Sequence, residues 1–521
     1  YDVLHRCACL REIGTKQLFN FIIQDWKLLL FLTFIFAVYF YYTSTFDFFE
    51  KKGVKFMKPS IFFGNLGPRF FAKQSFHEFQ VDIYKYFKGQ RYGGFFQGRK
   101  PLLYLLDPEL IKAVSIRDFE YFVDRNKFNS NEPRYLSRSL LNLQGSEWKA
   151  VRSTITPSFS ASRLKIMLPL IDVCSKQMVE FLKQYDKNEV EMKDVLGHFT
   201  LEVIGACAFG IKTDALEDEN ARFVKVAEKF NYISGPKRIL LFTMLMFVPD
   251  LIRFFNISFF NMESTSELMR ILKTSKEERK ASNVRKNDFL QLLLDAAAKE
   301  RENIDNNSKE SLDDDTIDAQ SLLFLIAGYE TSSTLLSFAT YMLAIRPDLQ
   351  DKLRNHIEEV TKGKEVTYEI LSQLDYLEAF LLETLRLYPP VARVDRACTK
   401  KYTLPDSNVH VDVGDIVSIP IYGIHMDPKL YPEPHEFKPD RFMNEEKKRS
   451  SHFLSFGIGP RNCIGMRFAM FTAKYAMVCL VKNFKFLPGP KTENPLQFDL
   501  KSFLLKAKNG LWIKIEKIEC E

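Results

Sequence analysis

The sequence predicts a mainly α-helical protein with small β-sheets, in which one large domain follows a single N-terminal transmembrane helix. Residues 28–46 carry no charge, and they are apolar along most of their length. From about Glu147 onward, long stretches show the apolar spacing of helices, whereas residues 80–117 and 503–517 alternate apolar and polar side chains as strands do. With 46% hydrophobic and 27% charged residues in a chain of 521, a large core can be buried.

The N-terminal part divides into three segments. Residues 1–27 carry no recognisable signature, and we interpret them as an extension that is either an addition to the natural chain or part of a targeting segment. Residues 28–46 predict a transmembrane anchor, because a helix of this length spans about 28 Å at ~1.5 Å per residue, close to the ~30 Å hydrocarbon core. A buried core helix is the alternative. Residues 47–68 predict a hinge, and residues 69–521 predict the folded domain.

Composition disfavours several function classes. The eight cysteines include no C-x-x-C pair, so neither a zinc site nor a disulfide framework is indicated, and a reducing compartment is favoured. The net charge of +7 is not concentrated in a basic domain, and no nucleic-acid-binding module is recognisable. The sequence therefore favours a globular enzyme or binding protein that does not bind nucleic acid.

Start and stop signals define two further elements. The acidic, Asn- and Ser-rich stretch 300–318 predicts a solvated loop that leads into a long apolar helix, which stops at Pro347. That helix would be about 45 Å long, enough to cross the whole domain. Near the C-terminus, the alternation around Asn509-Gly510 predicts a β-hairpin within residues 503–517.

The most informative stretch is the loop Phe456–Gly465, in which three glycines, a proline and an arginine surround Cys463. An apolar helical pattern follows at once, so Cys463 lies near a helix N-terminus, where the dipole favours a thiolate. Backbone N–H groups in the glycine turns can point at the sulfur, an arrangement that tunes a thiolate bound to iron. The alternative is an inert buried cysteine after a glycine-rich turn.

This pattern, Phe-Gly-x-Gly-x-Arg-x-Cys-x-Gly, resembles the haem-binding loop of cytochrome P-450, the family of haem-thiolate monooxygenases. The resemblance implies the cytochrome P-450 fold with haem b as cofactor and Cys463 as the axial metal ligand. It also implies that Phe456, Gly457 and Gly465 shape the loop against the haem. Arg461 would offer its forked cation to a haem propionate.

The long helix carries a second motif, Ala327-Gly328-Tyr329-Glu330-Thr331. The Thr331 hydroxyl can reach back to the carbonyl of Ala327, and Gly328 leaves one helix face bare, so a notch can open there. The sequence resembles the oxygen-binding helix of the family, which implies that Thr331 hydrogen-bonds the bound dioxygen and that Glu330 belongs to the proton relay. An ordinary buried helix is the alternative. Tyr329 stays unassigned between substrate contact and packing.

A third motif places Glu383 and Arg386 three residues apart on one helix face, before a pair of prolines. In isolation the pair could be a surface ion pair. It resembles the Glu-x-x-Arg motif of the family, which implies a buried pair joined by Arg441 from a later Pro-Asp-Arg-Phe segment. All three residues are assigned to core structure around the haem rather than to chemistry.

Further cations resemble the propionate ligands of the family. Trp148 and Arg152 are four residues apart and share a helix face, as in its Trp-x-x-x-Arg pair. Arg396 follows Arg386 by ten residues, at the position of another propionate arginine. For any single arginine in this set, a solvated surface charge is the alternative.

The resemblance covers nearly the whole body of the chain, and its finer texture is similar to insect microsomal detoxification members. It implies insertion of one oxygen atom of O2 into lipophilic substrates, either xenobiotics or endogenous lipids and hormones. The pocket walls would come from residues 119–143, the helix near Thr331, the residues after Pro390 and residues 500–504. Residues 239–260 are very apolar and either dip into the membrane lipid or pack internally.

Electrons must come from another protein, because the sequence has no nucleotide-binding fingerprint or flavin module. The resemblance implies an NADPH-dependent flavoprotein reductase as partner, with cytochrome b5 as a second candidate. Lys447-Lys448-Arg449 is either part of a docking patch or a solvated loop. The implied location is the endoplasmic reticulum membrane, with the catalytic domain on the cytosolic side.

Two other functions remain open at this stage. One is a haem-thiolate isomerase or dehydratase that rearranges hydroperoxides without O2 or a reductase. The other is a non-enzymatic protein that binds haem or lipophilic ligands. Neither needs Glu330 and Thr331, so both are disfavoured, and NADPH-dependent turnover would separate them from a monooxygenase.

Overall fold

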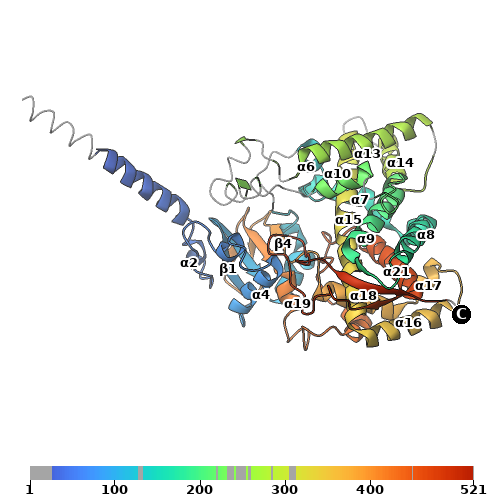
Figure 1. Ribbon diagram of the computed structural model, residues 1–521. Helices are drawn as coiled ribbons and strands as arrows, with labels where there is room; N and C mark the ends of the chain where they lie inside the picture. The colour runs from blue at the N-terminus through green and yellow to red at the C-terminus, as the bar shows by residue number, and fades with distance from the viewer. Residues whose placement is uncertain are drawn as a thin grey trace, which may run out of the picture.

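The protein is mainly helical, with one small sheet between the N-terminal helix and the helix-rich part of the domain, and with the C-terminal strand lying among the helices (Figure 1). The structure is a computed structural model. It describes residues 26–519 except 127–132, 219–220, 231–236, 238–239, 242–243, 245–253, 256–257, 259, 283–284, 304–311 and 449.

After the N-terminal helix Trp26–Thr43, the helices of the first half are α2 (Phe48–Lys51), α3 (Gly67–Phe70), α4 (Phe76–Tyr86), α5 (Pro108–Lys112), α6 (Arg134–Ser137), α7 (Gly145–Ile155), α8 (Ala161–Lys183), α9 (Met192–Ile204) and α10 (Arg222–Phe230). Those of the second half are α13 (Met262–Ser282), α14 (Phe289–Asn303), α15 (Asp314–Ile345), α16 (Pro347–Thr361), α17 (Tyr368–Ser372), α18 (Asp375–Leu387), α19 (Ile421–His425), α20 (Glu445–Lys448) and α21 (Met466–Asn483). Short π and 3-10 segments are η1 (Ala113–Arg117), η2 (Phe119–Tyr121), η3 (Thr156–Phe159), η4 (Gly205–Phe209) and η5 (Pro439–Phe442).

Three small sheets complete the described fold. The largest has the strand order β1-β2-β7-β4, in which β2 and β7 run parallel and the other neighbours antiparallel. An antiparallel sheet has the order β3-β9-β8, and β5 pairs with β6. The strands are β1 (Tyr92–Gln97), β2 (Lys100–Leu105), β3 (Glu189–Glu191), β4 (Val394–Ala397), β5 (Tyr402–Thr403), β6 (His410–Val411), β7 (Ile416–Ile419), β8 (Phe484–Leu487) and β9 (Trp512–Lys517).

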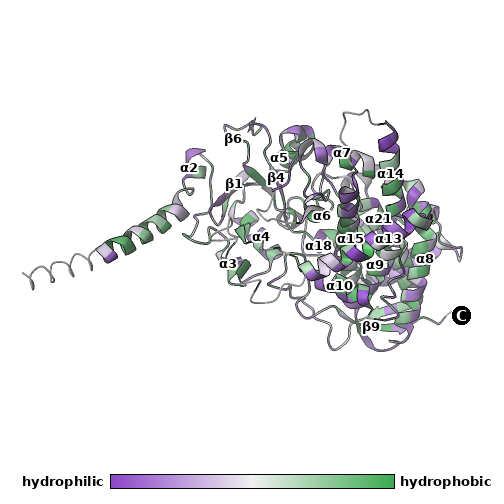
Figure 2. Cartoon of the chain, turned by 90° about the horizontal axis from the view of Figure 1, so that it is seen from above, coloured by the Kyte–Doolittle hydropathy of each residue, from purple (hydrophilic) through white to green (hydrophobic). Residues whose placement is uncertain are grey.

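The helix α15 is the central element of the helical part, and it lies among α9, α13, α18 and α21 (Figure 2). It begins at Asp314, where the Asp313 side chain caps it by accepting the N–H of Thr316 at 2.8 Å. The loop predicted over residues 300–318 is therefore too long, since residues 300–303 end α14 and residues 314–318 form the first turn of α15. It ends at Ile345, before Pro347. Its length and composition would also allow a membrane span, but half of its most apolar window is buried inside the domain.

The helix Trp26–Thr43 is the other candidate membrane span, and it projects from the domain (Figure 1). It begins at Trp26, two residues before the start of the predicted anchor, and it ends at Thr43, three residues before the predicted end. The segment that follows packs against the sheet: Phe49 is buried, and its ring meets the ring of Phe96 in β1 edge-on at 5.2 Å. The expected hinge therefore begins with a packed helix, α2.

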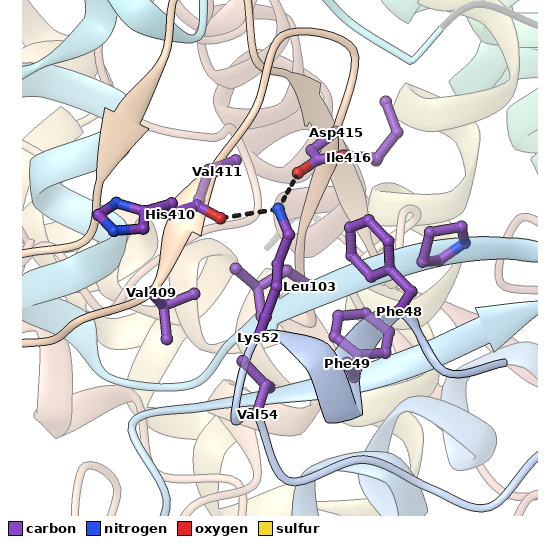
Figure 3. A pocket seen from close by; sticks show the side chains of 11 residues that line it. Phe48, Phe49, Lys52, Val54, Leu103, Val409, His410, Val411, Asp415 and Ile416 are labelled. Carbon is purple, nitrogen blue, oxygen red and sulfur yellow. Dashed lines mark hydrogen bonds and ion pairs between the residues drawn. The ribbon is translucent and has the colours of Figure 1, made fainter. Parts of the chain in front are cut away.

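Lys52, at the end of α2, fastens this segment to the rest of the domain. Its Nζ donates to the carbonyl of His410 at 2.8 Å and pairs with Asp415 at 2.8 Å and Asp412 at 2.9 Å. Figure 3 shows the ammonium of Lys52 between His410 and Asp415, over a pocket walled by Phe48 and Val409 among other apolar residues. The contacts join the chain directly after the anchor to β6 and to the residue before β7.

Two expectations about strands need correction. The hairpin predicted around Asn509-Gly510 is wrong, because β9 pairs with β3 and β8 instead of with the residues before the turn. Both long-range partners let Ile513 and Ile515 become fully buried, a gain that the local turn signal cannot offer. In residues 80–117, β1 and β2 are strands, but the segments on either side are helical.

Candidate functional site

The cysteine loop is a tight turn in front of α21. Gly457 and Gly459 have φ values of +67° and +75°, which only glycine adopts easily. A Cβ on Gly459 would lie 1.8 Å from the carbonyl oxygen of Ser115, so the loop also needs glycine there for close packing. The N–H of Cys463 donates to the carbonyl of Phe456 at 2.8 Å, and Gly465 serves as the N-cap of α21. This geometry fixes Cys463 at the N-terminus of the helix.

Two opposing influences act on the Cys463 thiol. Burial is the largest and raises its pKa, although the side chain itself is exposed. The N–H groups of Gly465 and Met466 hydrogen-bond the sulfur and lower the pKa, as do the nearby guanidinium groups of Arg152 and Arg125. Burial prevails, so the pKa of the free Cys463 thiol is raised. The donors and cations around the exposed sulfur would stabilise a thiolate once a metal ion binds it.

Four arginines gather beside the cysteine loop from four separate segments of the chain. They are Arg125 in the loop after η2, Arg152 in α7, Arg396 in β4 and Arg461 in the cysteine loop. Burial and the neighbouring cations lower the pKa of Arg396 and of Arg461 to about 9. Since arginine stays protonated in proteins, this lowering marks the cost of burying these cations, to which their mutual repulsion adds.

The anionic partners of this cluster are few. Arg461 lies 3.8 Å from Asp124, while Asp395 is already paired with Arg393 at 3.1 Å. Buried Nε atoms of Arg125 and Arg396 have no hydrogen-bond partner among the described residues. A haem carries two propionate carboxylates that would accept these donors and balance the charge, so the residues present fit this cofactor.

The contacts of the predicted propionate ligands differ from one another. Arg461 donates to the carbonyls of Val123 and Leu143, both at 2.8 Å, and its guanidinium lies 4.0 Å from the ring centroid of Trp148. Arg152 donates to both the carbonyl and the side chain of Asn462 at 3.1 and 2.9 Å. Trp148 is therefore a platform for Arg461, and Arg152 braces the loop one residue before the cysteine.

Sequence reasoning missed Arg125. Its Nη2 donates to the carbonyl of Arg461 at 3.4 Å. Its charge also interacts with Cys463 and lowers the pKa of Arg396. A single arginine in a variable loop carries no spacing signal that would set it apart from a solvated charge. Only the long-range fold brings it to the cluster.

The motif on α15 has the predicted back-bond, in which the Thr331 hydroxyl donates to the carbonyl of Ala327 at 2.7 Å. Ala327 is exposed although it lies midway along a central helix, so this face of α15 is open. Glu330 points to another helix, and its Oε1 pairs with Lys193 of α9 at 3.1 Å. Tyr329 also faces α9, because its ring would contact a Cβ on Gly197 at 3.5 Å.

The three predicted structural residues lie together in the interior. The Arg386 guanidinium makes two hydrogen bonds to Glu383 at 2.7 and 2.8 Å, and both residues are fully buried. Arg441 joins Glu383 at 3.3 Å from η5. The remaining donors of Arg386 meet the carbonyls of His425 and Pro434 at 3.0 and 2.8 Å. The group fixes α18 to the segment that leads into the cysteine loop.

Two expectations fall largely outside the described residues. Most of residues 239–260 are not described, so the choice between membrane contact and internal packing stays a prediction. Of the basic run before the cysteine loop, Lys448 lies 3.7 Å from Asp375 of α18, and Arg449 is not described.

Comparison with known proteins agrees with this geometry. A sequence model of the family described as cytochrome P450 matches residues 55–513. Cytochrome P450 9e2 of Blattella germanica is 38% identical over 502 residues, which cover 90% of this chain and 94% of that protein. Cytochrome P450 6a8 of Drosophila melanogaster is 35% identical, with 90% and 95% covered. Because the match includes the cysteine loop, the α15 motif and the buried Glu383–Arg386 pair, the chain belongs to the cytochrome P450 family.

Proposed function

We propose that this monooxygenase oxidises lipophilic substrates with Cys463 as the thiolate ligand of haem b and the arginine cluster as the propionate site. The observation that carries the proposal is an exposed, hydrogen-bonded thiol beside four arginines that have few anionic partners among the described residues. Arg396 and Arg461 are buried, and Arg125 and Arg152 are half-buried. When bound, haem supplies the activation of O2, so that one oxygen atom enters the substrate and the other leaves as water.

The protein's own residues divide the remaining work. The backbone N–H groups of Gly465 and Met466 hold the sulfur in place and limit how much charge it donates. Arg125, Arg152, Arg396 and Arg461 would fix the plane of the haem through its carboxylates. The Thr331 hydroxyl lies on the open face of α15, where it can hold a proton near the reacting oxygen, and Glu330 is the adjacent acid.

Substrate and electrons reach the site from outside the domain. We assign the helix Trp26–Thr43 to the endoplasmic reticulum membrane, with the domain on the cytosolic side, where lipophilic xenobiotics and endogenous lipids concentrate. An NADPH-dependent flavoprotein reductase would deliver the electrons, with cytochrome b5 as a second candidate donor.

The test is the carbon monoxide difference spectrum of the reduced protein. Wild type is expected to show the strongly red-shifted Soret band of a thiolate-ligated haem, and Cys463→Ser is expected to lose it. Cys479→Ser, in the same helix region but partly buried away from the loop, is the matched control and should keep the band. A histidine-type band in wild type, or folded protein without haem, would contradict the proposal.

A turnover assay separates the monooxygenase from the alternatives. Product formation should require both NADPH and reductase. Rearrangement of a hydroperoxide without either would favour an isomerase, and ligand binding without any turnover would favour a binding protein.

A further inference from the structure

The α9 helix places a cation directly against the proton-delivery motif of α15. Lys193 lies in the first turn of α9, and its Nζ is 3.1 Å from Oε1 of Glu330. Neither side chain is freely solvated, since 17% of the Lys193 side chain and 22% of the Glu330 side chain are exposed. None of the sequence motifs discussed above includes this lysine.

The ammonium of Lys193 binds the whole turn, not only the carboxylate. It donates to the hydroxyls of Ser333 at 2.6 Å and Thr334 at 3.0 Å, and it lies 3.2 Å from the carbonyl of Glu330. Both hydroxyls also donate to that carbonyl, at 3.1 and 2.8 Å. Hydroxyl groups that bond back to the preceding turn loosen a helix, so Lys193 holds together a turn that its own sequence weakens.

The contact is rigid because α9 is held to α15 at more than one point. The Thr200 hydroxyl, two turns along α9, lies 3.2 Å from the carbonyl of Tyr329. Gly197 lies between these points and lets the Tyr329 ring approach α9. The carboxylate of Glu330 is therefore held toward α9, one residue before Thr331 and one helical turn after the exposed Ala327.

We propose that Lys193 is a positioning residue for proton delivery, which acts by holding Glu330 and the turn beside Thr331 in one arrangement. The inference rests on the proposed function. While the carboxylate of Glu330 is bound by Lys193 it is held toward α9, so the ion pair sets how often the acid turns toward the open face. The other charged groups that influence the ammonium are Glu191 and Lys506.

Loss of Lys193 should therefore uncouple electron use from product formation. In Lys193→Met, the fraction of NADPH electrons recovered in product is expected to fall about tenfold, with peroxide formed instead. Complete loss of an acid–base group typically lowers the rate by about 10²–10⁴-fold, and a misplaced group should cost less than a lost one. Lys193→Arg keeps the charge and should restore most of the coupling. If Lys193→Met fails to bind haem, Lys193→Gln carries the same comparison.

The chain supplies a matched control in Lys276. This lysine of α13 forms a buried ion pair with Asp318 of α15 at 2.5 Å, twelve residues before Glu330. Lys276→Met removes a buried charge from the same helix without touching the motif. It should lower thermal stability at least as much as Lys193→Met while leaving the coupling at the wild-type value.

A double-mutant cycle with Glu330→Gln tests whether Lys193 acts through Glu330. The double variant should be no more uncoupled than Glu330→Gln alone, and the melting temperatures of the four proteins should show the same non-additivity without any turnover. Three results would each overturn the inference. The first is a double variant whose uncoupling is the product of the two single effects. The others are wild-type coupling in Lys193→Met and equal uncoupling in Lys276→Met. A wild type without the red-shifted band would instead overturn the proposed function.

Discussion

Two neighbouring arginines in and before β4 experience opposite electrostatic environments. Arg393 is paired with Asp395 at 3.1 Å, and this carboxylate raises the pKa of the guanidinium. Arg396, three residues later, has its pKa lowered to about 9 by burial and by Arg125. One cation is thus part of a balanced buried pair, and the other is held in the haem-free protein against repulsion.

This contrast predicts opposite effects of the same substitution. Arg396→Met should leave the haem-free protein as stable as wild type or more stable, since it removes an unbalanced buried charge, and it should speed haem loss about tenfold. Arg393→Met should destabilise the haem-free protein by about 3 kcal/mol, because Asp395 then loses its paired cation and keeps only the hydrogen bonds from Ser418 and Asn126. Denaturant unfolding of the haem-free forms and transfer of haem to an acceptor protein measure the two effects. A loss of stability in Arg396→Met would contradict the charge argument.

Candidate site residues that belong to a motif with fixed spacing were recognisable in the sequence, and isolated residues outside such motifs were not. Arg152 follows Trp148 by one helical turn, and the glycines around Cys463 are specific to the loop, so both were recognisable as patterns. Arg125 and Lys193 are single cations on a loop and a helix start, and only the packing of distant segments gives them partners.

At the scale of elements, His425 connects the end of α18 to the beginning of the cysteine loop. Its Nδ1–H donates to the carbonyl of Arg386, and its Nε2 accepts the N–H of Leu454, both at 3.0 Å. These two partners fix one neutral tautomer, since a carbonyl can only accept and an amide N–H can only donate. Burial and the Arg386 guanidinium lower the pKa of His425 to about 3.

The connection predicts acid sensitivity with a defined sign. The folded-state pKa lies below the unfolded value of about 6.5, so the stability that His425 contributes is complete above pH 6.5 and is lost as pH falls toward 3. At ~1.4 kcal/mol per unit, the loss amounts to several kcal/mol. His425→Phe should be less stable at pH 7 but show a shallower fall of unfolding free energy with acid. His77, with its pKa lowered to about 4, keeps part of the slope.

Denaturant titrations between pH 4 and 7 measure this slope. His435→Phe changes an exposed histidine and serves as the control, with the wild-type slope expected. A His425→Phe slope equal to wild type would show that other groups govern the acid sensitivity.

Element prediction succeeded where local signals and packing agree. The cap at Asp313 and the stop at Pro347 gave α15 its bounds, because charge and backbone geometry act within one turn of the helix end. The Asn509-Gly510 turn was read correctly as a turn, with φ of +85° at Gly510, but not as a hairpin. The pairing of β9 with β3, hundreds of residues earlier in the chain, cannot be read from local alternation.

At the scale of the whole molecule, the anchor is built into the domain rather than tethered to it. The Arg99 guanidinium, in the β1–β2 turn, lies 3.7 Å from the ring centroid of Tyr41, near the end of the N-terminal helix. The Thr45 hydroxyl donates to the carbonyl of Arg99 at 2.7 Å, and Arg99 donates to Ser44 at 3.1 Å. Together with those of Lys52, these contacts join the chain to the domain both just before the predicted hinge and within its first residues.

A docked anchor fixes the angle between the domain and the bilayer, and Arg99 is the residue on which this depends most. With spin labels introduced as unnatural amino acids at Leu29 and Lys112 in lipid nanodiscs, wild type should give a narrow distance distribution. Arg99→Ala removes the cation–π contact and the Ser44 bond, so its distribution should broaden, whereas the exposed Arg117→Ala should match wild type. Since the partners of Arg99 named above do not belong to the cysteine loop or the arginine cluster, both variants should keep the red-shifted carbon monoxide band. A broad distribution in wild type would mean that the anchor moves independently and that substrate entry does not depend on one fixed orientation.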